Sequence, residues 1–258
     1  MKIHNLVATL VALPMLIGSA KAGTITFDNP GDTAGATVDR YAPAVFQSGV
    51  AFGGHAGTLQ EGTSASDGAN NRPPAYSSSF YNTQGMAFAV SPNTNEISVQ
   101  LYVPGNLTSD GRYAGLWGVG LDATSAVSAY PIIELDRIAG VDTWLGWNSD
   151  GSWTTMGTAS SGWNTLDIKL LTGSDQFQYT VNGGLLTLTD ADGSVGLKSA
   201  ILQVHNTTDG IAYDAHWDNL TSAVPEPSTW ALMIVGFGLM GATMLRTTRR
   251  KQAMAAAA

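Results

Sequence analysis

The stretch that decides the fold is residues 163–188, WNTLDIKLLTGSDQFQYTVNGGLLTL. It predicts strands at 163–171, 176–181 and 185–188, the last two joined by the turn Asn182-Gly183-Gly184. Asn and Gly tolerate the positive φ angles that a tight hairpin turn needs. Apolar and polar residues alternate along these strands, which predicts one buried face per strand. We assign Trp163, with its apolar neighbours along the first strand, to the core.

The same pattern continues outward on both sides of this stretch. Further strands are predicted at residues 80–90, 96–103, 114–121, 131–137, 143–148, 153–156, 201–205 and 211–220. Polar, turn-rich residues 55–74 are expected to form a long surface loop. No middle segment keeps the apolar spacing of a helix over three turns. The pattern is typical of an antiparallel β-sandwich of about 200 residues.

Composition excludes several functions. The chain has no cysteine, so disulfides, thiolate catalysis and cysteine metal sites are excluded. Residues 23–223 hold 19 acidic and six basic residues, a formal charge of −13. Nucleic-acid binding draws on clusters of Lys and Arg, so it is not expected here. An acidic domain of this kind suits an extracellular setting, or contact with neutral sugars or cations.

Three segments resemble the late strands of concanavalin A-like lectin and glucanase domains (LamG-like). They are GWNTLDI at residues 162–168, FQYTVNGG at 177–184, and IAYD at 211–214 followed by DNL at 218–220. The resemblance covers about 60 residues, and the front half of the domain matches only in general character. It implies an antiparallel jelly-roll sandwich that binds or cleaves carbohydrate.

A pair of carboxylates tests the glucanase interpretation. Glucanases of the resembled group carry E-x-D-x-x-E on one strand, and Glu134-Leu135-Asp136 matches its first half. The last position is Ala139, so the acid/base carboxylate is missing, and the next candidate, Asp142, lies beyond a turn glycine. Retaining glycosidases need two carboxyl groups about 5 Å apart. We therefore expect no enzymatic activity, with Glu134 and Asp136 on the solvent face of their strand.

Tryptophans are frequent between residues 117 and 163. Sugar rings stack on exposed aromatic side chains, so Trp117, Trp144 and Trp153 are candidate glycan contacts, with core packing as the alternative for each. Trp144 and Trp147 have opposite parity on one strand, so they cannot share a platform.

Metal-binding signals are few. Asp190-Ala191-Asp192-Gly193 resembles half of a calcium loop, because oxygen ligands at alternate positions suit Ca²⁺. The alternative is an ordinary Asp-Gly turn. His55, His205 and His216 lack zinc-ligand spacing. No cofactor is expected apart from this candidate structural calcium.

The N-terminus, residues 1–22, has the three parts of a signal peptide. Lys2 and His4 form a basic start, residues 6–17 are mostly apolar, and Ala20-Lys21-Ala22 forms an A-x-A site before Gly23. The apolar run is shorter than the roughly 20 residues that span a membrane. We expect cleavage by signal peptidase, leaving an ectodomain at residues 23–222.

The C-terminal segment, residues 223–251, combines three features. Pro225-Glu226-Pro227 and Trp230-Ala231 open it, an apolar helix is expected at residues 230–245, and a basic tail follows at 246–251. The basic residues of this tail are Arg246, Arg249, Arg250 and Lys251. This order resembles the PEPxxWA form of the PEP-CTERM sorting signal. Residues 252–258 are expected to be a disordered end.

The resemblance to PEP-CTERM proteins implies processing by exosortase, a membrane-embedded protease of Gram-negative bacteria. A 16-residue helix would measure about 24 Å, short of a bilayer core of about 30 Å. The segment would thus hold the chain in the inner membrane transiently, with the basic residues on the cytoplasmic side. Release to the cell surface or extracellular matrix would follow.

Together these features predict a surface or matrix protein whose sandwich binds glycan, with exopolysaccharide as the expected partner. A glycoside hydrolase with a degraded motif and a structural spacer without ligand remain as alternatives.

Overall fold

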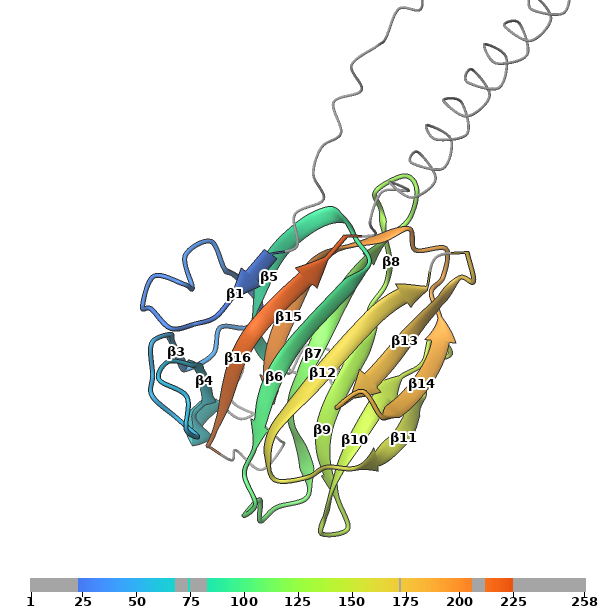
Figure 1. Ribbon diagram of the computed structural model, residues 1–258. Coiled ribbons are helices and arrows are strands. Elements are labelled where there is room, and N and C mark those ends of the chain that lie inside the picture. Colours follow the sequence, from blue (N-terminus) through green and yellow to red (C-terminus); the bar gives the residue numbers. More distant parts are fainter. Residues whose placement is uncertain (1–22, 68–73, 75–82, 172, 206–211, 225–258) are drawn as a thin grey trace, which may run out of the picture.

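The structure is a computed structural model that describes residues 23–67, 74, 83–171, 173–205 and 212–224 (Figure 1). Two antiparallel sheets and one short 3₁₀ turn, η1 (Ala65–Asp67), make up its regular elements. Sheet A contains, in spatial order, β14 (Leu185–Asp190), β13 (Gln176–Val181), β12 (Gly162–Leu171), β6 (Glu96–Val103), β16 (Tyr213–Ala223), β4 (Leu59–Thr63) and β3 (Val45–Gln47), with β1 (Gly23–Ile25) beside β16. Sheet B contains β11 (Trp153–Thr158), β10 (Val141–Trp147), β9 (Ile132–Ile138), β7 (Gly111–Leu121), β15 (Gly196–His205), β5 (Thr83–Thr94) and β2 (Thr37–Arg40), with β8 (Val127–Ala129) beside β7.

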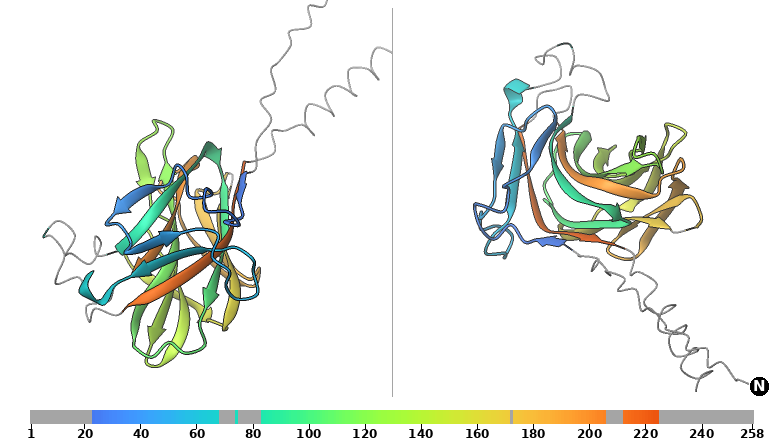
Figure 2. Two further views of the ribbon diagram at one scale, coloured as in Figure 1. Left: turned by 90° about the vertical axis from the view of Figure 1, so that its left-hand side faces the viewer. Right: turned by 90° about the horizontal axis from the view of Figure 1, so that it is seen from above.

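The sheets pack face to face, and alternation along each strand builds the core between them. In β6 the inward residues are Ile97, Val99, Leu101 and Val103, each fully buried, while their neighbours are partly exposed. Both sheets bend in the same direction, so the outer face of sheet B lies on the inner side of the bend (Figure 2). The expectation of an all-β antiparallel sandwich is confirmed.

The hairpin predicted at residues 176–188 is present. β13 pairs with β14 from Val181↔Leu185 outward, and Asn182 and Gly183 take φ angles of 53° and 69°. Both angles are left-handed, and Asn and Gly tolerate them in the three-residue connection 182–184. The predicted strand at residues 96–103 also has the bounds that the structure shows.

The prediction of a surface loop over residues 55–74 is wrong in part. Leu59–Thr63 forms β4, which pairs with β16 and β3 in sheet A. Its inward side chains are Leu59 and Glu61, both fully buried. The sequence signal was weak because a carboxylate occupies a core position of a strand with a single large apolar residue.

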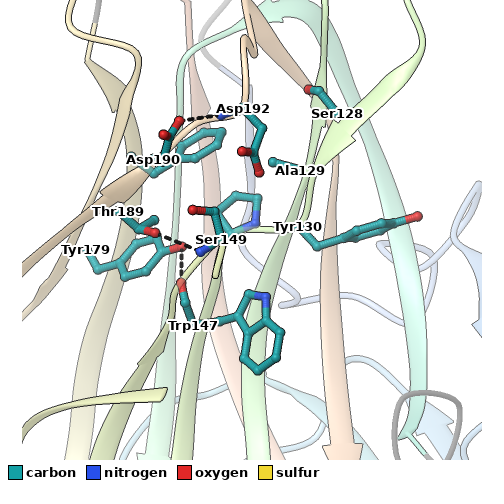
Figure 3. Close-up of a pocket in the computed structure, with 11 residues that line it drawn as sticks. Ser128, Ala129, Tyr130, Trp147, Ser149, Tyr179, Thr189, Asp190 and Asp192 are labelled. Atoms are coloured by element: carbon teal, nitrogen blue, oxygen red, sulfur yellow. Dashed lines mark hydrogen bonds between the residues drawn. The ribbon is translucent and has the colours of Figure 1, made fainter. Parts of the chain in front are cut away.

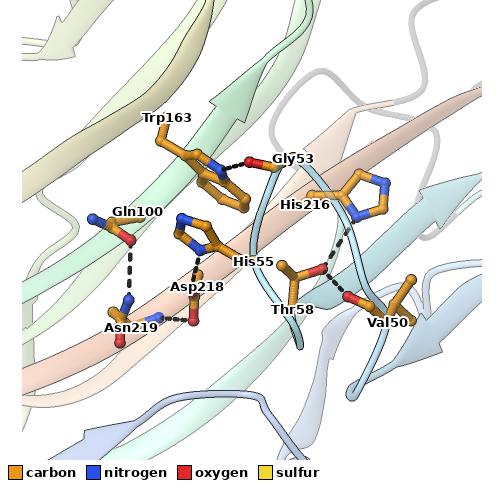
Figure 4. Close-up of polar contacts among 9 residues, drawn as sticks. All are labelled: Val50, Gly53, His55, Thr58, Gln100, Trp163, His216, Asp218 and Asn219. Atoms are coloured by element: carbon orange, nitrogen blue, oxygen red, sulfur yellow. Dashed lines mark hydrogen bonds and ion pairs between the residues drawn. The ribbon is translucent and has the colours of Figure 1, made fainter.

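The assignment of Trp163 to the core is also wrong. Asn164, Leu166 and Ile168 of β12 point inward, so Trp163 has the opposite parity and lies on the outer face of sheet A. There it stacks on His55 at 4.3 Å between ring centroids and donates a hydrogen bond from Nε1 to the Gly53 carbonyl at 2.9 Å (Figure 4).

These contacts fasten the β3–β4 loop, residues 48–58, onto sheet A. His55 Nδ1 pairs with Asp218 Oδ2 of β16, and Phe52 stacks on His216 at 3.5 Å between centroids. Burial lowers the pKa of His216, which favours its neutral form in this stack. The loop thus covers part of the outer face of sheet A with aromatic contacts.

The expected signal peptide and C-terminal apolar helix lie outside the described residues. Within the part of the chain that the structure describes, no helix has the length and apolar character needed to cross a membrane.

Candidate functional site

The outer face of sheet B gathers charged and aromatic side chains. In β9, Ile133 and Leu135 belong to the core between the sheets, so Glu134 and Asp136 point to the opposite side. The register of β7 places Gly115 beside Glu134 and Arg112 beside Asp136. Glycine at position 115 is needed there, because an added Cβ would lie 2.7 Å from the Ile133 carbonyl oxygen. The close approach of β7 and β9 brings the charges of both strands together.

Glu134 is fully buried on this face and contacts two side chains, the imidazole of His205 and the guanidinium of Arg112. Its Oε1 contacts Nε2 of His205 on β15, and its Oε2 lies 3.7 Å from Nη1 of Arg112. A buried carboxylate needs such partners, because removal from water disfavours its charge. The expected side of the strand is confirmed, but the expected exposure of Glu134 to solvent is wrong.

Asp136 is the second carboxylate of the site. Burial, and then repulsion by the neighbouring Glu134, raise the pKa of Asp136 to about 6, although Arg112 lowers it in part. A carboxyl group that titrates near neutral pH can hold or release a proton under ordinary conditions.

The incomplete glucanase motif has a structural explanation. Ala139 and Gly140 form the turn between β9 and β10, with φ angles of 50° and 81°. The position that would carry the acid/base carboxylate therefore lies in a hairpin turn. Asp142, the next acid, pairs with Arg137 across the same hairpin. Neither position 139 nor position 142 adds a carboxylate beside Glu134 and Asp136.

The aromatic residues of this face have different environments. Trp117 is 2 % exposed and lies under Arg40, whose guanidinium carbon is 4.7 Å from the ring centroid. Arg40 is ion-paired with Asp39, which accepts a hydrogen bond from Gln203 Nε2 at 2.8 Å. Arg40 and Trp117 therefore belong to the packed floor of the face.

Trp153 and Trp147 form an aromatic edge at one side of the face. Their rings meet edge to face at 4.9 Å between centroids, and both are only partly buried. Arg112 lies over the Trp153 ring at 5.8 Å. We call Trp147, Trp153 and Arg112 the tryptophan edge.

The three candidate glycan contacts are thus separated. Trp153 is accessible at the tryptophan edge, Trp117 is covered, and Trp144 is fully buried in the core between the sheets. Trp144 presents no surface to a ligand. The accessible partner is Trp147, which was not among the three candidates and lies on the opposite side of the strand from Trp144.

The candidate calcium residues lie beside a small cavity of about 140 Å³ near Tyr130 and Trp147 (Figure 3). Asp190 Oδ1 accepts a hydrogen bond from the backbone amide of Asp192 at 2.9 Å, as in an ordinary Asp turn. Burial and the nearby acids Asp190 and Asp175 raise the pKa of Asp192. Among the described residues, no group of three or more His, Cys, Asp or Glu is placed to hold a metal ion.

The three histidines in the part of the chain that the structure describes lie on two different sheets. His205 lies on sheet B beside Glu134, whereas His55 and His216 lie on the outer face of sheet A. Gly23 begins β1, and the other residues expected for signal cleavage and sorting lie outside the described part of the chain.

Comparison with known proteins identifies the tail. Residues 223–251 match a family model described as the PEP-CTERM protein-sorting motif. No curated protein matches the chain in sequence.

The sandwich is similar to several solved structures. A sialidase has 10 % identity and a TM-score of 0.54 over 80 % of this chain, which spans only 19 % of the sialidase. A carbohydrate esterase of Shiga toxin-encoding bacteriophage phi24B has 14 % identity and a TM-score of 0.51, covering 78 % of this chain and 99 % of its own. An endo-β-galactosidase of Clostridium perfringens that releases GlcNAcα1-4Gal has 12 % identity and a TM-score of 0.50, covering 82 % of this chain and 64 % of its own. At these identities the likeness shows a shared β-sandwich fold, and residues 223–251 carry the PEP-CTERM motif.

Proposed function

We propose that the protein is exported, processed by an exosortase-type protease at residues 223–251, and delivered to the cell surface or extracellular matrix of a Gram-negative bacterium. The match to the PEP-CTERM motif carries this proposal. The signal-peptide pattern at residues 1–22 agrees with it, because a sorting protease in the membrane acts on exported chains.

Replacing Pro225-Glu226-Pro227 with alanines tests the sorting proposal in the host. We expect the altered protein to stay membrane-bound at its unprocessed mass, because the protease loses its recognition motif. Replacing Ser228 and Thr229 with alanines serves as the matched control, since the PEPxxWA pattern leaves these positions open. Unchanged mass and location of the first variant would show that the motif does not direct processing.

We propose that the sandwich of concanavalin A-like type binds carbohydrate on the outer face of sheet B. The observation that supports this most is the tryptophan edge, where two partly buried indoles lie beside a guanidinium group. Such an arrangement offers a sugar an apolar ring surface and hydrogen-bond donors at the same place. The similarity to the fold of carbohydrate-active enzymes is consistent with this role.

A glycan array probed with the full chain in mild detergent tests the binding proposal. Trp153→Ala removes half of the tryptophan edge, so we expect affinity for any bound glycan to fall at least about tenfold. Trp163→Ala is the matched control, because Trp163 is a partly buried indole on the outer face of sheet A. Equal loss in the two variants would contradict a site on sheet B.

A glycoside hydrolase is the second candidate, favoured by Glu134 and Asp136 on one face and by the Asp136 pKa of about 6. Reducing-sugar release that Glu134→Gln abolishes, at unchanged folded content, would support it. A protein that neither binds nor cleaves any glycan would instead be a structural spacer at the surface.

A further inference from the structure

A second pocket opens on the outer face of sheet B, where β2, β5 and β15 lie side by side. It measures about 310 Å³, near the lower limit of known small-ligand sites. Small or apolar side chains form its floor, among them Ala87, Ala89 and the almost fully buried Ile201. Tyr130 and Lys198 stand at its wall. The pocket therefore combines an apolar base, an aromatic ring and an ammonium group.

Tyr130 connects this pocket with the rest of the face. It lines both the 310 Å³ pocket and the smaller cavity beside Trp147. Figure 3 shows its ring directed away from Trp147 and from the turn at Asp190 and Asp192. A chain molecule that lies on the tryptophan edge could thus continue past Tyr130 into this pocket.

The charge on the pocket wall is unusual for this domain. The described part of residues 23–223 has five cationic side chains, and four of them are ion-paired: Arg40 with Asp39, Arg112 with Glu134, Arg137 with Asp142, and Lys169 with Glu96. For Lys198, an exposed residue, no acid lies within ion-pair distance in the part of the chain that the structure describes.

The acid that lines the same pocket as Lys198 already has partners. Asp39 also lines the pocket, but its Oδ2 is held by Arg40 and by Gln203. The other polar side chains that line the pocket carry the neutral hydroxyls of Thr37, Ser199 and Tyr130. The ammonium group is thus the charge that the pocket offers to a ligand.

We propose that this pocket binds a carboxylate-bearing sugar of an acidic polysaccharide. Lys198 pairs with the carboxylate, the Tyr130 ring packs against the sugar, and the hydroxyls of Thr37 and Ser199 meet its polar groups. Residues 23–223 carry a formal charge of −13, which would repel an acidic polymer at long range. At physiological salt the Debye length is about 8 Å, so this repulsion is screened while the direct contact with Lys198 is not. The inference rests on the proposed carbohydrate binding and adds its substrate class.

Affinity electrophoresis of the full chain tests the inference. The probes are polygalacturonate, alginate and hyaluronate, each paired with its carboxyl-reduced, neutral counterpart. We expect at least one acidic polymer to bind about tenfold more tightly than its neutral counterpart, as one charge-assisted contact would give.

Variants locate the preference. Lys198→Gln removes the charge from an exposed position and is expected to abolish the preference for the acidic polymer, whereas Lys198→Arg retains it. Lys169→Gln is the matched control, because Lys169 is paired with Glu96 on sheet A; this variant should leave binding unchanged.

The outcomes separate this inference from the proposal on which it rests. If acidic and carboxyl-reduced polymers bind equally, and Trp153→Ala abolishes the binding of both, the pocket does not select a carboxylate-bearing sugar. Carbohydrate binding on sheet B would then still stand. A preference that survives in Lys198→Gln also overturns it. Absence of binding to all six polymers and to the wider array overturns both.

Discussion

The outer faces of sheet A and sheet B lie on opposite sides of the sandwich, and they differ in what covers them. On sheet A the β3–β4 loop lies across the strands, held by the stacking of His55 on Trp163 and of Phe52 on His216. On sheet B the floor holds the buried carboxylate of Glu134 in contact with the buried His205 ring, with partly buried tryptophans at the side.

This difference between the two outer faces indicates which of them is expected to carry a function. Aromatic contacts that are satisfied by the chain's own loop stabilise a surface, as on sheet A. A charged side chain that is buried outside the core between the sheets lowers the stability of the fold. The buried carboxylate on sheet B therefore indicates a functional site. Substitutions can test this contrast.

The largest effect is expected in the core that both faces share. Trp144→Ala deletes a fully buried indole and should lower the free energy of unfolding by about 4 kcal/mol. Trp153→Ala, at the partly exposed edge, should cost less than about 1 kcal/mol. Urea denaturation monitored by circular dichroism compares them. Similar losses would mean that Trp153 is a core residue and not part of a ligand surface.

The next effect concerns the buried carboxylate of Glu134 on sheet B. Glu134→Ala leaves Arg112 and the buried His205 without their carboxylate, so we expect a loss of about 3 kcal/mol. Asp136→Asn is the control, since Asp136 is more exposed and its raised pKa shows that its charge is not favoured. A smaller loss in Glu134→Ala than in the control would refute the view that Glu134 anchors the face.

A third prediction uses pH. Burial raises the pKa of Glu61 well above its ordinary value, while the nearby Trp217 indole and Met86 backbone offset this only in part. The folded protein then binds more protons than the unfolded chain above about pH 4.5, so the stability contributed by Glu61 falls as pH rises through that window.

Glu61→Gln should therefore be about as stable as the parent at pH 4 and about 2 kcal/mol more stable at pH 8. Asp28→Asn, at an exposed carboxyl group, is the control and should show no such gain. Thermal unfolding measured at a series of pH values gives the stability of each variant and of the parent as a function of pH. Parallel curves for Glu61→Gln and the parent would contradict it.

The last prediction concerns the outer face of sheet A, where a small effect is expected. His55→Ala removes the stack on Trp163 and the pair with Asp218, both near solvent, and should cost about 1 kcal/mol. Hydrogen exchange should quicken at residues 48–58 while the amides of sheet B keep their protection. Faster exchange across both sheets would show that the loop stabilises the whole sandwich.

The positions of several strands could be predicted from the chain because local signals suffice there. Alternation along Glu96–Val103 and the turn at Asn182-Gly183 depend only on neighbouring residues. The same reasoning failed for β4, whose core position 61 is a glutamate, and for Trp163, where a large apolar side chain outweighed its parity.

The candidate site was only partly within reach of the sequence. Glu134 and Asp136 could be placed on one face, and Trp147 could be separated from Trp144 by parity alone. The partners His205, Gln203, Arg40 and Lys198 could not be found, because strands distant in sequence bring them to the same face. Pairing between β2, β5, β15, β7 and β9 is a long-range event that no local pattern encodes.

The motif at residues 223–251 and the alternation along the strands both depend only on residues that are neighbours in the chain. The amino-acid sequence alone was therefore enough to identify the sorting motif and the β-sandwich class. Which face is covered, which carboxylate is buried and where Lys198 stands depended on the packing of the two sheets. Burial and ion pairing arise between residues far apart in the chain, and only the folded structure brings them together.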